Sequence, residues 1–160
     1  MVTNPVVLVD KKDTEIGQSD IIHAHKGIGQ RHRAISLFLF NKNGELLLQQ
    51  RSHKKLIGAG QWANTCCGHV LPKETSLNCA KRKLKQELGI SDILLTPLYK
   101  FEYHIKCDKN YSEWEIDQVF IGKYDGPIKP NTKEVQSYQW QKFTPWFLKM
   151  LTHQKLLKYL

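Results

Sequence analysis

The chain has 160 residues, a net charge of +9 at pH 7 and a hydrophobic fraction of 41%. Its length fits a single globular domain, and it holds no apolar run near the ~18 residues of a membrane-spanning helix. The basic charge alone would suit a protein that binds nucleic acid or anionic membrane. The lysines are spread along the chain, however, and no RNA-binding or basic-region motif accompanies them. A basic surface also concentrates small polyanions near a pocket.

The start of the chain and its cysteines bear on its location. Residues 1–10 lack a basic segment followed by a long apolar one, so no signal peptide is expected. The four cysteines form no C-x-x-C pair and no obvious disulfide framework. We therefore expect reduced thiols and a cytoplasmic location.

Apolar runs bounded by turn residues predict the strands. A short strand comes first, and Asn43-Gly44 then marks a hairpin between two longer runs. In chain order, the predicted strands are Val6–Val9, Ile35–Phe40, Leu46–Gln50, Ile93–Tyr103, Trp114–Tyr124 and Gln136–Trp140.

One long helix is predicted in the middle of the chain. Thr75 or Ser76 can cap its start, and Gly89 ends it. Lys83 and Glu87 are one helical turn apart and lie side by side next to its apolar stripe. The stripe consists of Leu77, Ala80, Leu84 and Leu88.

A second helix is predicted to open at Thr144-Pro145, with proline at its first position. Strands and helices interleave without a regular βαβ alternation. This order predicts one α/β (more narrowly α+β) domain over residues 1–160, with a mixed sheet flanked by helices.

Three carboxylates are expected on one face of a strand. Glu113, Glu115 and Asp117 alternate with other residues, and alternate residues of a strand share a face. Like charges side by side are unfavourable unless solvent, basic side chains or a metal compensates them. For Glu113 and Glu115 alone, an exposed strand face is as good an explanation as a functional one.

Histidines add to this group. His23, His25 and His32 lie in one segment, and His69 lies two residues after Cys67. For any single histidine, a hydrogen-bonded structural role is the simpler interpretation. Together with the carboxylates they are suited to bind Mn, Fe, Zn or Mg.

Residues 68–90 follow the pattern of the Nudix box, G-x5-E-x7-R-E-U-x-E-E-x-G-U, a loop and helix that binds diphosphates through metal ions. The matching positions are Gly68, Glu74, Arg82, Glu87 and Gly89. Lys83 and Gln86 replace two of the glutamates. The scaffold is therefore kept without the full carboxylate set that hydrolysis by water needs, which suggests chemistry on the organic part of a diphosphate.

Candidate reactive and basic groups surround this box. Cys67 is either a small buried hydrophobe, the usual fate of a free cysteine, or a thiol whose pKa is tuned by polar neighbours. Cys66 is expected to be buried on the opposite face. Candidates for contact with diphosphate oxygens, with plain surface charge as the alternative, are Arg51, Lys54, Lys55 and Lys83.

The combination of these residues resembles type 1 isopentenyl-diphosphate isomerase, a Nudix-fold enzyme. The resemblance runs from about Val7 to Trp146. The segments that carry it are His25-x6-His32, Trp62-x-Asn64-x-x-Cys67-Gly68-His69, the altered box, Tyr103 and Glu113-x-Glu115.

The resemblance implies a role for each matching residue. One divalent ion, Mn²⁺, Zn²⁺ or Mg²⁺, would be held by His25, His32, His69, Glu113 and Glu115. A Mg²⁺ shared with the substrate diphosphate would be held by Glu87 and the backbone carbonyl of Cys67. The diphosphate would contact Arg51, Lys55 and Lys83, and Trp146 would close over the hydrocarbon end.

The implied reaction moves the double bond of isopentenyl diphosphate to give dimethylallyl diphosphate. One carbon gains a proton and another loses one, which requires two proton-transfer groups on opposite sides of the substrate. Cys67 and Glu115 would form this catalytic pair, with Tyr103 hydrogen-bonded to Glu115. The sequence leaves open which is acid and which is base. The expected partners are these small diphosphates, without nucleic acid or membrane, and the expected state is a monomer.

Two other functions remain open. A Nudix hydrolase of a nucleoside or other diphosphate would need the box carboxylates that Lys83 and Gln86 replace. A non-catalytic Nudix domain that binds nucleic acid would explain the +9 charge and would bind with a steep salt dependence. It would leave the histidines and the Glu-x-Glu pair without a role.

Overall fold

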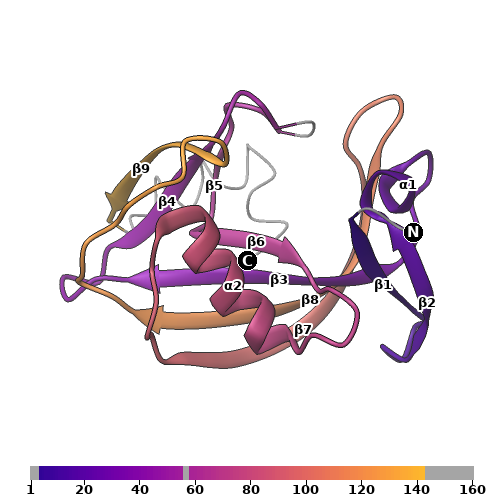
Figure 1. Cartoon of the computed structure of the whole chain (residues 1–160), viewed down its shortest axis with the longest axis horizontal. Coiled ribbons are helices and arrows are strands. Elements are labelled where there is room, and N and C mark those ends of the chain that lie inside the picture. Colours follow the sequence, from indigo (N-terminus) through magenta and orange to yellow (C-terminus); the bar gives the residue numbers. More distant parts are fainter. Residues whose placement is uncertain (1–3, 56–57, 143–160) are drawn as a thin grey trace.

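A computed structural model describes residues 4–55 and 58–142 (Figure 1). Two helices and nine strands make up this part of the chain. In chain order they are β1 (Pro5–Val9), β2 (Glu15–Asp20), α1 (Ile21–His25), β3 (His32–Phe40), β4 (Leu46–Arg51), β5 (Trp62–Ala63), β6 (Cys66–His69), α2 (Ser76–Leu88), β7 (Leu95–Lys106), β8 (Ser112–Lys123) and β9 (Val135–Gln141). The expected α+β class with a mixed sheet is confirmed, because β3 pairs parallel with β8 and antiparallel with β6.

Strand β3 is the centre of the sheet and separates the hydrophobic core from a cavity. Ile35, Leu37 and Leu39 are fully buried in the main core, which they share with α2. The alternate side chains of β3 point the other way, as the pleat requires. Among them, Ala34, Ser36 and Phe38 line a cavity on the opposite face of the sheet.

Helix α2 lies across one face of the sheet (Figure 1). The Thr75 side chain caps its first turn, and Gly89 ends it in the left-handed conformation, φ 68°, that glycine adopts readily. Both ends match the sequence prediction. One position of the predicted stripe is wrong, because Leu77 is 37% exposed while Cys79 is buried in its stead. Leu77 lies in the first turn, where the helix has only begun to approach the sheet.

The predicted hairpin at Asn43-Gly44 is confirmed as a turn but not as a long ladder. Within the described residues, β3 and β4 pair only at Phe40 and Leu46. Beyond that pair the two strands separate, and β4 pairs with β5 and β9 instead. The sheet is therefore split along this line, and Leu46 and Leu48 line the cavity on the β4 side.

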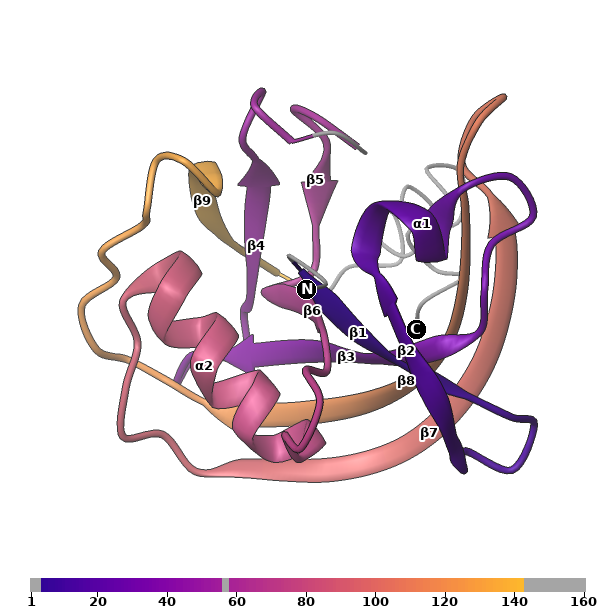
Figure 2. The same cartoon turned by 45° about the vertical axis from the view of Figure 1, so that its right-hand side comes forward.

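Strands β7 and β8 form a long hairpin that curves around the molecule to reach α1 (Figure 2). Near its tip, Tyr111 bridges to Lys26, which directly follows α1, and Asn110 O accepts a hydrogen bond from Gly27 N. The Ser112 hydroxyl donates to Gly27 O at 2.7 Å. The hairpin thus holds the loop between α1 and β3 in place.

Four short elements were absent from the sequence prediction: β2, α1, β5 and β6. The helix predicted at Thr144-Pro145 lies outside the described residues. In the part of the chain that is described, neither helix is long and apolar enough to span a membrane.

Candidate metal centre and active site

Helix α1 positions His25 at the cavity. Asp20 caps it by accepting a hydrogen bond from Ile22 N at 2.9 Å, and the helix ends after only five residues. Its inner side buries Ala24 and His25. The Nδ1 atom of His25 bonds to Ile21 O at 2.7 Å, one turn back in the same helix. This bond turns Nε2 of His25 toward the interior of the cavity.

His32 is oriented in the same way at the start of β3. It is fully buried, and its Nδ1 bonds to Gln30 O at 2.7 Å. A backbone carbonyl can only accept, so Nδ1 carries a proton and Nε2 is the nitrogen that faces the cavity. Histidines that bind metal ions typically donate their other ring nitrogen to a carbonyl or carboxylate in this way.

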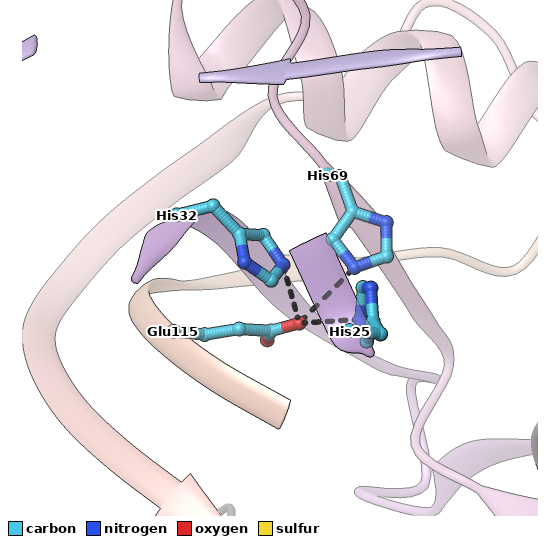
Figure 3. A group of neighbouring side chains, drawn as sticks. All are labelled: His25, His32, His69 and Glu115. Carbon is cyan, nitrogen blue, oxygen red and sulfur yellow. Dashed lines mark hydrogen bonds and ion pairs between the residues drawn. The ribbon is translucent and has the colours of Figure 1, made fainter. Parts of the chain in front are cut away.

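The three Nε2 atoms converge on one carboxylate oxygen (Figure 3). Glu115 Oε1 lies 3.1 Å from His69 Nε2, 3.3 Å from His32 Nε2 and 3.8 Å from His25 Nε2. The four ligand atoms all lie within 4.8 Å of one another. Four of the five predicted ligands for the divalent ion therefore come together.

The fifth predicted ligand, Glu113, is not a member of this group. It is half-buried and lines the same cavity, two residues before Glu115 on β8. Its negative charge acts on His25, where it helps to raise the pKa. Its role as a ligand stays a prediction.

The electrostatics of this group reflect burial and close pairing. Burial opposes ionisation of Glu115, but the close polar contacts with the three histidines outweigh it and hold the pKa of the carboxyl well below its usual value. Burial lowers the pKa of His69 to about 4, against the opposing effect of Glu115. Burial also acts to lower the pKa of His25, but the bonds to Glu115 and Ile21 raise it overall.

The donor set fits a divalent transition metal. Within residues 4–55 and 58–142, His32 Nε2 is buried and has no hydrogen-bond partner, although the bond of Nδ1 to Gln30 O aims it at the group. Imidazole nitrogens with a carboxylate suit Zn, Mn or Fe better than they suit a purely oxygen-loving ion. A cation at this centre would give the unpartnered nitrogen a bond.

Tyr103 lies on β7 directly opposite Glu115 in the β7–β8 ladder. Its hydroxyl donates to Glu115 Oε2, the oxygen that the histidines do not share. Burial and then the charge of Glu115 raise the pKa of Tyr103 well above its usual value, so the phenol stays protonated. The contact predicted between these two residues is confirmed.

Cys67 faces the same cavity from β6, on the other side of β3. Its thiol is half-buried and lies 2.8 Å from Asn64 Oδ1. Burial and the charge of Asp117 raise the pKa of Cys67 to about 12. Cys66 points the opposite way and is fully buried in the core, as predicted.

Asp117 continues the carboxylate face of β8. It is 2% exposed and accepts a hydrogen bond from the Ser36 hydroxyl at 2.7 Å. Burial and the charge of Glu115 raise its pKa to about 7. Its second oxygen, Oδ1, has no hydrogen-bond partner among the residues that the structure describes.

The box glutamate Glu87 is almost fully buried at the back of the cavity. It is ion-paired with Lys83, as the helical spacing predicted, and accepts bonds from Gln49 Nε2 at 3.0 Å and Cys66 Sγ at 3.2 Å. Burial opposes its ionisation, but the charge of Lys83 and these bonds lower the pKa of Glu87 overall. Glu87 is thus a buried carboxylate next to the ammonium group of Lys83.

Gly68 makes room for Lys83. A Cβ atom at Gly68 would lie 2.6 Å from Cγ, 2.8 Å from Cδ and 2.9 Å from Cε of that lysine. The aliphatic chain of Lys83 therefore crosses the backbone of β6 directly, and any larger residue at position 68 would displace it.

The predicted diphosphate ligands Arg51, Lys55 and Lys83 all line the cavity. Lys55 is ion-paired with Glu134, so its ammonium has a carboxylate partner in this structure. Trp146 lies outside the described residues, and its contact with the hydrocarbon end stays a prediction.

A family model of the NUDIX domain matches residues 30–155, most of the chain. The chain belongs to the NUDIX family. Curated relatives narrow this placement. Isopentenyl-diphosphate Delta-isomerase 1 of Aromatoleum aromaticum is 42% identical, over 84% of this chain and 75% of its own length. Isopentenyl-diphosphate Delta-isomerase of Pectobacterium atrosepticum is 37% identical, over 89% of this chain and 86% of its own length. At this identity and coverage, the chain is a NUDIX protein of the isopentenyl-diphosphate Delta-isomerase family.

Solved structures agree with the NUDIX fold. A crystal structure from Deinococcus radiodurans superposes with a TM-score of 0.74 at 20% identity, covering 94% of this chain and 90% of that one. A MutT protein from Methanosarcina mazei Go1 gives a TM-score of 0.59 at 23% identity, covering 76% and 81%. At these identities the likeness concerns the fold alone.

Within the NUDIX box, Glu74 and Arg82 form a structural clamp. Arg82 Nε and Nη2 bond to the two oxygens of Glu74 at 2.7 and 2.8 Å, and Nη2 also bonds to His69 O at 3.1 Å. Glu74 Oε2 in turn accepts from Leu71 N at 3.0 Å. The clamp ties the loop after β6 to helix α2, and so fixes the backbone that carries His69.

Sequence reasoning missed two polar residues that this NUDIX site uses. Ser36 holds Asp117, and Gln49 holds Glu87. Each is a buried polar residue within an apolar strand run, and that interruption was the available signal. Asn64 was noted only as part of a motif, without its contact to Cys67.

Proposed function

We propose that this protein is an isopentenyl-diphosphate Delta-isomerase, which converts isopentenyl diphosphate to dimethylallyl diphosphate. The observation that carries the proposal is the joint occurrence, in one cavity, of the His25–His32–His69–Glu115 group and the Cys67 thiol. The family membership supports the same reaction, since relatives of 37–42% identity carry that name.

The reaction needs a proton added to one carbon and a proton removed from another, at groups that face a flat substrate from two sides. Cys67 and Glu115 suit this need, because they extend into the cavity from β6 and β8, the two strands that flank β3. Tyr103 fixes one carboxylate oxygen of Glu115 by a hydrogen bond. The other oxygen of Glu115 faces the histidines, so contacts at both oxygens keep the carboxylate from rotating.

Two ions are proposed as cofactors. The His25, His32, His69 and Glu115 group would hold one, Mn²⁺, Zn²⁺ or Mg²⁺, with Glu113 as a further ligand. Glu87 and the backbone carbonyl of Cys67 would hold Mg²⁺ together with the substrate diphosphate. When bound, the ions would supply positive charge that favours the ionised carboxylates and attracts the phosphate oxygens.

Substrate recognition is proposed to rest on cations at one end of the cavity and apolar side chains at the other. Arg51, Lys55 and Lys83 would bind the diphosphate, and charge-assisted bonds of this kind are the strong ones. Phe38, Leu48 and Trp62 line the same cavity and would contact the hydrocarbon. Trp146 is proposed to close over that hydrocarbon and to exclude water, which would otherwise trap a carbocation. We further propose a cytoplasmic monomer that acts on small diphosphates.

The alternative hydrolase is disfavoured by one specific contact. Hydrolysis by water needs several box carboxylates to gather metal ions, but here the ammonium of Lys83 occupies one such position and pairs with Glu87. A role in nucleic-acid binding would use the basic surface and leave the buried histidine group without a purpose.

The test is conversion of isopentenyl diphosphate in the presence of Mg²⁺ by the wild type and by Cys67→Ala and Glu115→Gln. Both variants should lose at least ~10²-fold in turnover, because a proton-transfer group of this kind contributes roughly 10²–10⁴-fold. Glu102→Gln is a matched control, since Glu102 is exposed and lies on β7 outside the cavity lining. Turnover within a few-fold of wild type in either active-site variant would remove that residue from the pair. Phosphate release from a panel of diphosphates, without isomerisation, would establish the hydrolase instead.

A further inference from the structure

Asn64 lies between β5 and β6, against the thiol of Cys67. Its side chain is buried, with 7% of the residue exposed. The Asn64 Oδ1 atom accepts a hydrogen bond from Cys67 Sγ at 2.8 Å, a short contact for a sulfur donor. We propose that Asn64 is a positioning residue, which holds the S–H bond of Cys67 in one direction within the cavity. Its effect on turnover rests on the proposed function.

The orientation of the Asn64 amide is set by the backbone. Its nitrogen Nδ2 faces two carbonyl oxygens, Cys66 O at 3.3 Å and Leu37 O at 3.5 Å. Carbonyl oxygens only accept, so the nitrogen must point at them and the oxygen must point away. The network itself therefore fixes the assignment of oxygen and nitrogen in this amide, and Oδ1 is left to face the thiol.

Ser36, another neighbour of the thiol, offers it no donor. Ser36 Oγ lies 3.9 Å from Cys67 Sγ, but its proton is given to Asp117 Oδ2 at 2.7 Å. The sulfur thus sits between two oxygens that accept hydrogen bonds, and the nearer one belongs to Asn64. A thiol in this environment keeps its proton and directs it at Asn64.

A fixed thiol matters for a proton transfer to or from carbon, because small errors in the placement of a reacting group cost large factors in rate. Asn64 acts on the sulfur of Cys67 through their hydrogen bond. Its loss should therefore lower kcat by roughly 10- to 100-fold and leave KM within about twofold. A residue that merely stabilised the fold would show no such split.

The hydrogen bond can be measured directly by the infrared S–H stretching band. The difference spectrum between wild type and Cys67→Ala isolates the Cys67 band, and the difference with Cys107→Ala gives that of an exposed thiol for reference. We expect the Cys67 band at lower frequency than the Cys107 band, and a shift back toward it in Asn64→Ala. A Cys67 band at the exposed-thiol frequency in the wild type would overturn the proposal, and this measurement does not require the Asn64 variant to fold.

Kinetics supply the second arm. Asn64→Ala is compared with Asn41→Ala, which removes an amide that bonds to the backbone of the β3–β4 turn, outside the cavity. The proposal stands if kcat falls in the first variant and not in the second, with KM unchanged in both. It is overturned if Asn64→Ala turns over like the wild type. A wild type without isomerase activity would refute the proposed function, and the infrared band would then decide the role of Asn64 alone.

Discussion

His32 lies directly opposite Glu115 in the parallel pairing of β3 and β8, with Nε2 of the histidine 3.3 Å from Oε1 of the carboxylate. A shift of one residue in either strand would turn its side chain to the other face of the sheet, because strand side chains alternate. His69 joins from β6 through the pairing of Ala34 with His69. The register of three adjacent strands thus assembles most of the metal group.

The first prediction concerns metal affinity. His32→Ala should bind Mn²⁺ or Zn²⁺ at least roughly tenfold more weakly than wild type, because the most deeply buried ligand nitrogen is lost. Metal content after dialysis and the rise in Tm on adding metal both measure this, since a ligand that binds only the folded state raises stability. His23→Ala is the matched control, as His23 lies in α1 but outside the ligand group. Full occupancy in His32→Ala would refute the ligand assignment, and the same test applies to His25→Ala.

The second prediction concerns Gly68. Gly68→Ala should displace Lys83, because the added Cβ meets three atoms in the middle of its chain. We expect KM for the diphosphate to rise several-fold and stability to fall by about 1–3 kcal/mol, the usual cost of overpacking.

A double-mutant cycle separates this effect from a general one. In a Lys83→Ala background the clash is gone, so Gly68→Ala should cost far less there than in the wild type. Equal costs in the two backgrounds would show that Gly68 acts through something other than Lys83.

The third prediction concerns pH and is made for metal-free protein. The pKa of Asp117 is raised from 3.8 to about 7 by burial and by the charge of Glu115. Between these values the folded state keeps a proton that the unfolded state has lost, so this carboxyl makes stability fall as pH rises from about 4 to about 7.

Asp117→Asn should remove that slope. Relative to wild type, the variant should gain stability as pH rises through this window, by at most about 4 kcal/mol at about 1.4 kcal/mol per pKa unit. Urea unfolding at several pH values, with a chelator present, measures the difference. Parallel curves for the two proteins would contradict the raised pKa.

The fourth prediction concerns the clamp between Arg82 and Glu74. Arg82→Ala should lower the free energy of unfolding by about 1–3 kcal/mol, because it leaves a half-buried carboxylate without its two-pronged partner. Lys100→Ala breaks a pair with Asp13 in which the lysine side chain is 48% exposed, and Asp13 keeps its pair with Arg33, so this change should cost less than about 1 kcal/mol. Denaturant melts of both variants compare the two costs directly, and a larger loss in Lys100→Ala would refute the ranking.

Much of the fold was predictable because its main elements have strong local signals. Helix α2 has a Thr75 cap, a Gly89 stop and apolar positions at helical spacing, and its bounds were correct. Strand β2 and helix α1 were missed for the opposite reason. The segment Glu15–Asp20 is polar and largely exposed, and α1 has only five residues. Contacts with β1 and with the β7–β8 hairpin hold these two elements in place. Their own sequences carry no pattern that would predict them.

The site was predictable as a set of residues but not as a geometry. The family resemblance supplied His25, His32, His69 and Glu115, and the structure brings them together. Glu113 shares a strand face with Glu115 and still lies outside the group. The alternation along a strand predicts which face a side chain is on, but not how far that side chain reaches. The partners that hold the site, such as Ser36 and Gln49, come from strands distant in sequence, so local patterns carry little about them.

Cys66 and Cys67 are adjacent in sequence but have no chemistry in common. The alternation of β6 places the first thiol in the core, where it donates to Glu87, and the second in the cavity, where it donates to Asn64. An alkylating reagent that reaches the cavity should therefore modify Cys67, slowly because its pKa is raised to about 12, and spare its buried neighbour Cys66. Peptide mapping after such labelling would then report on access to the cavity itself, with an internal reference one residue away.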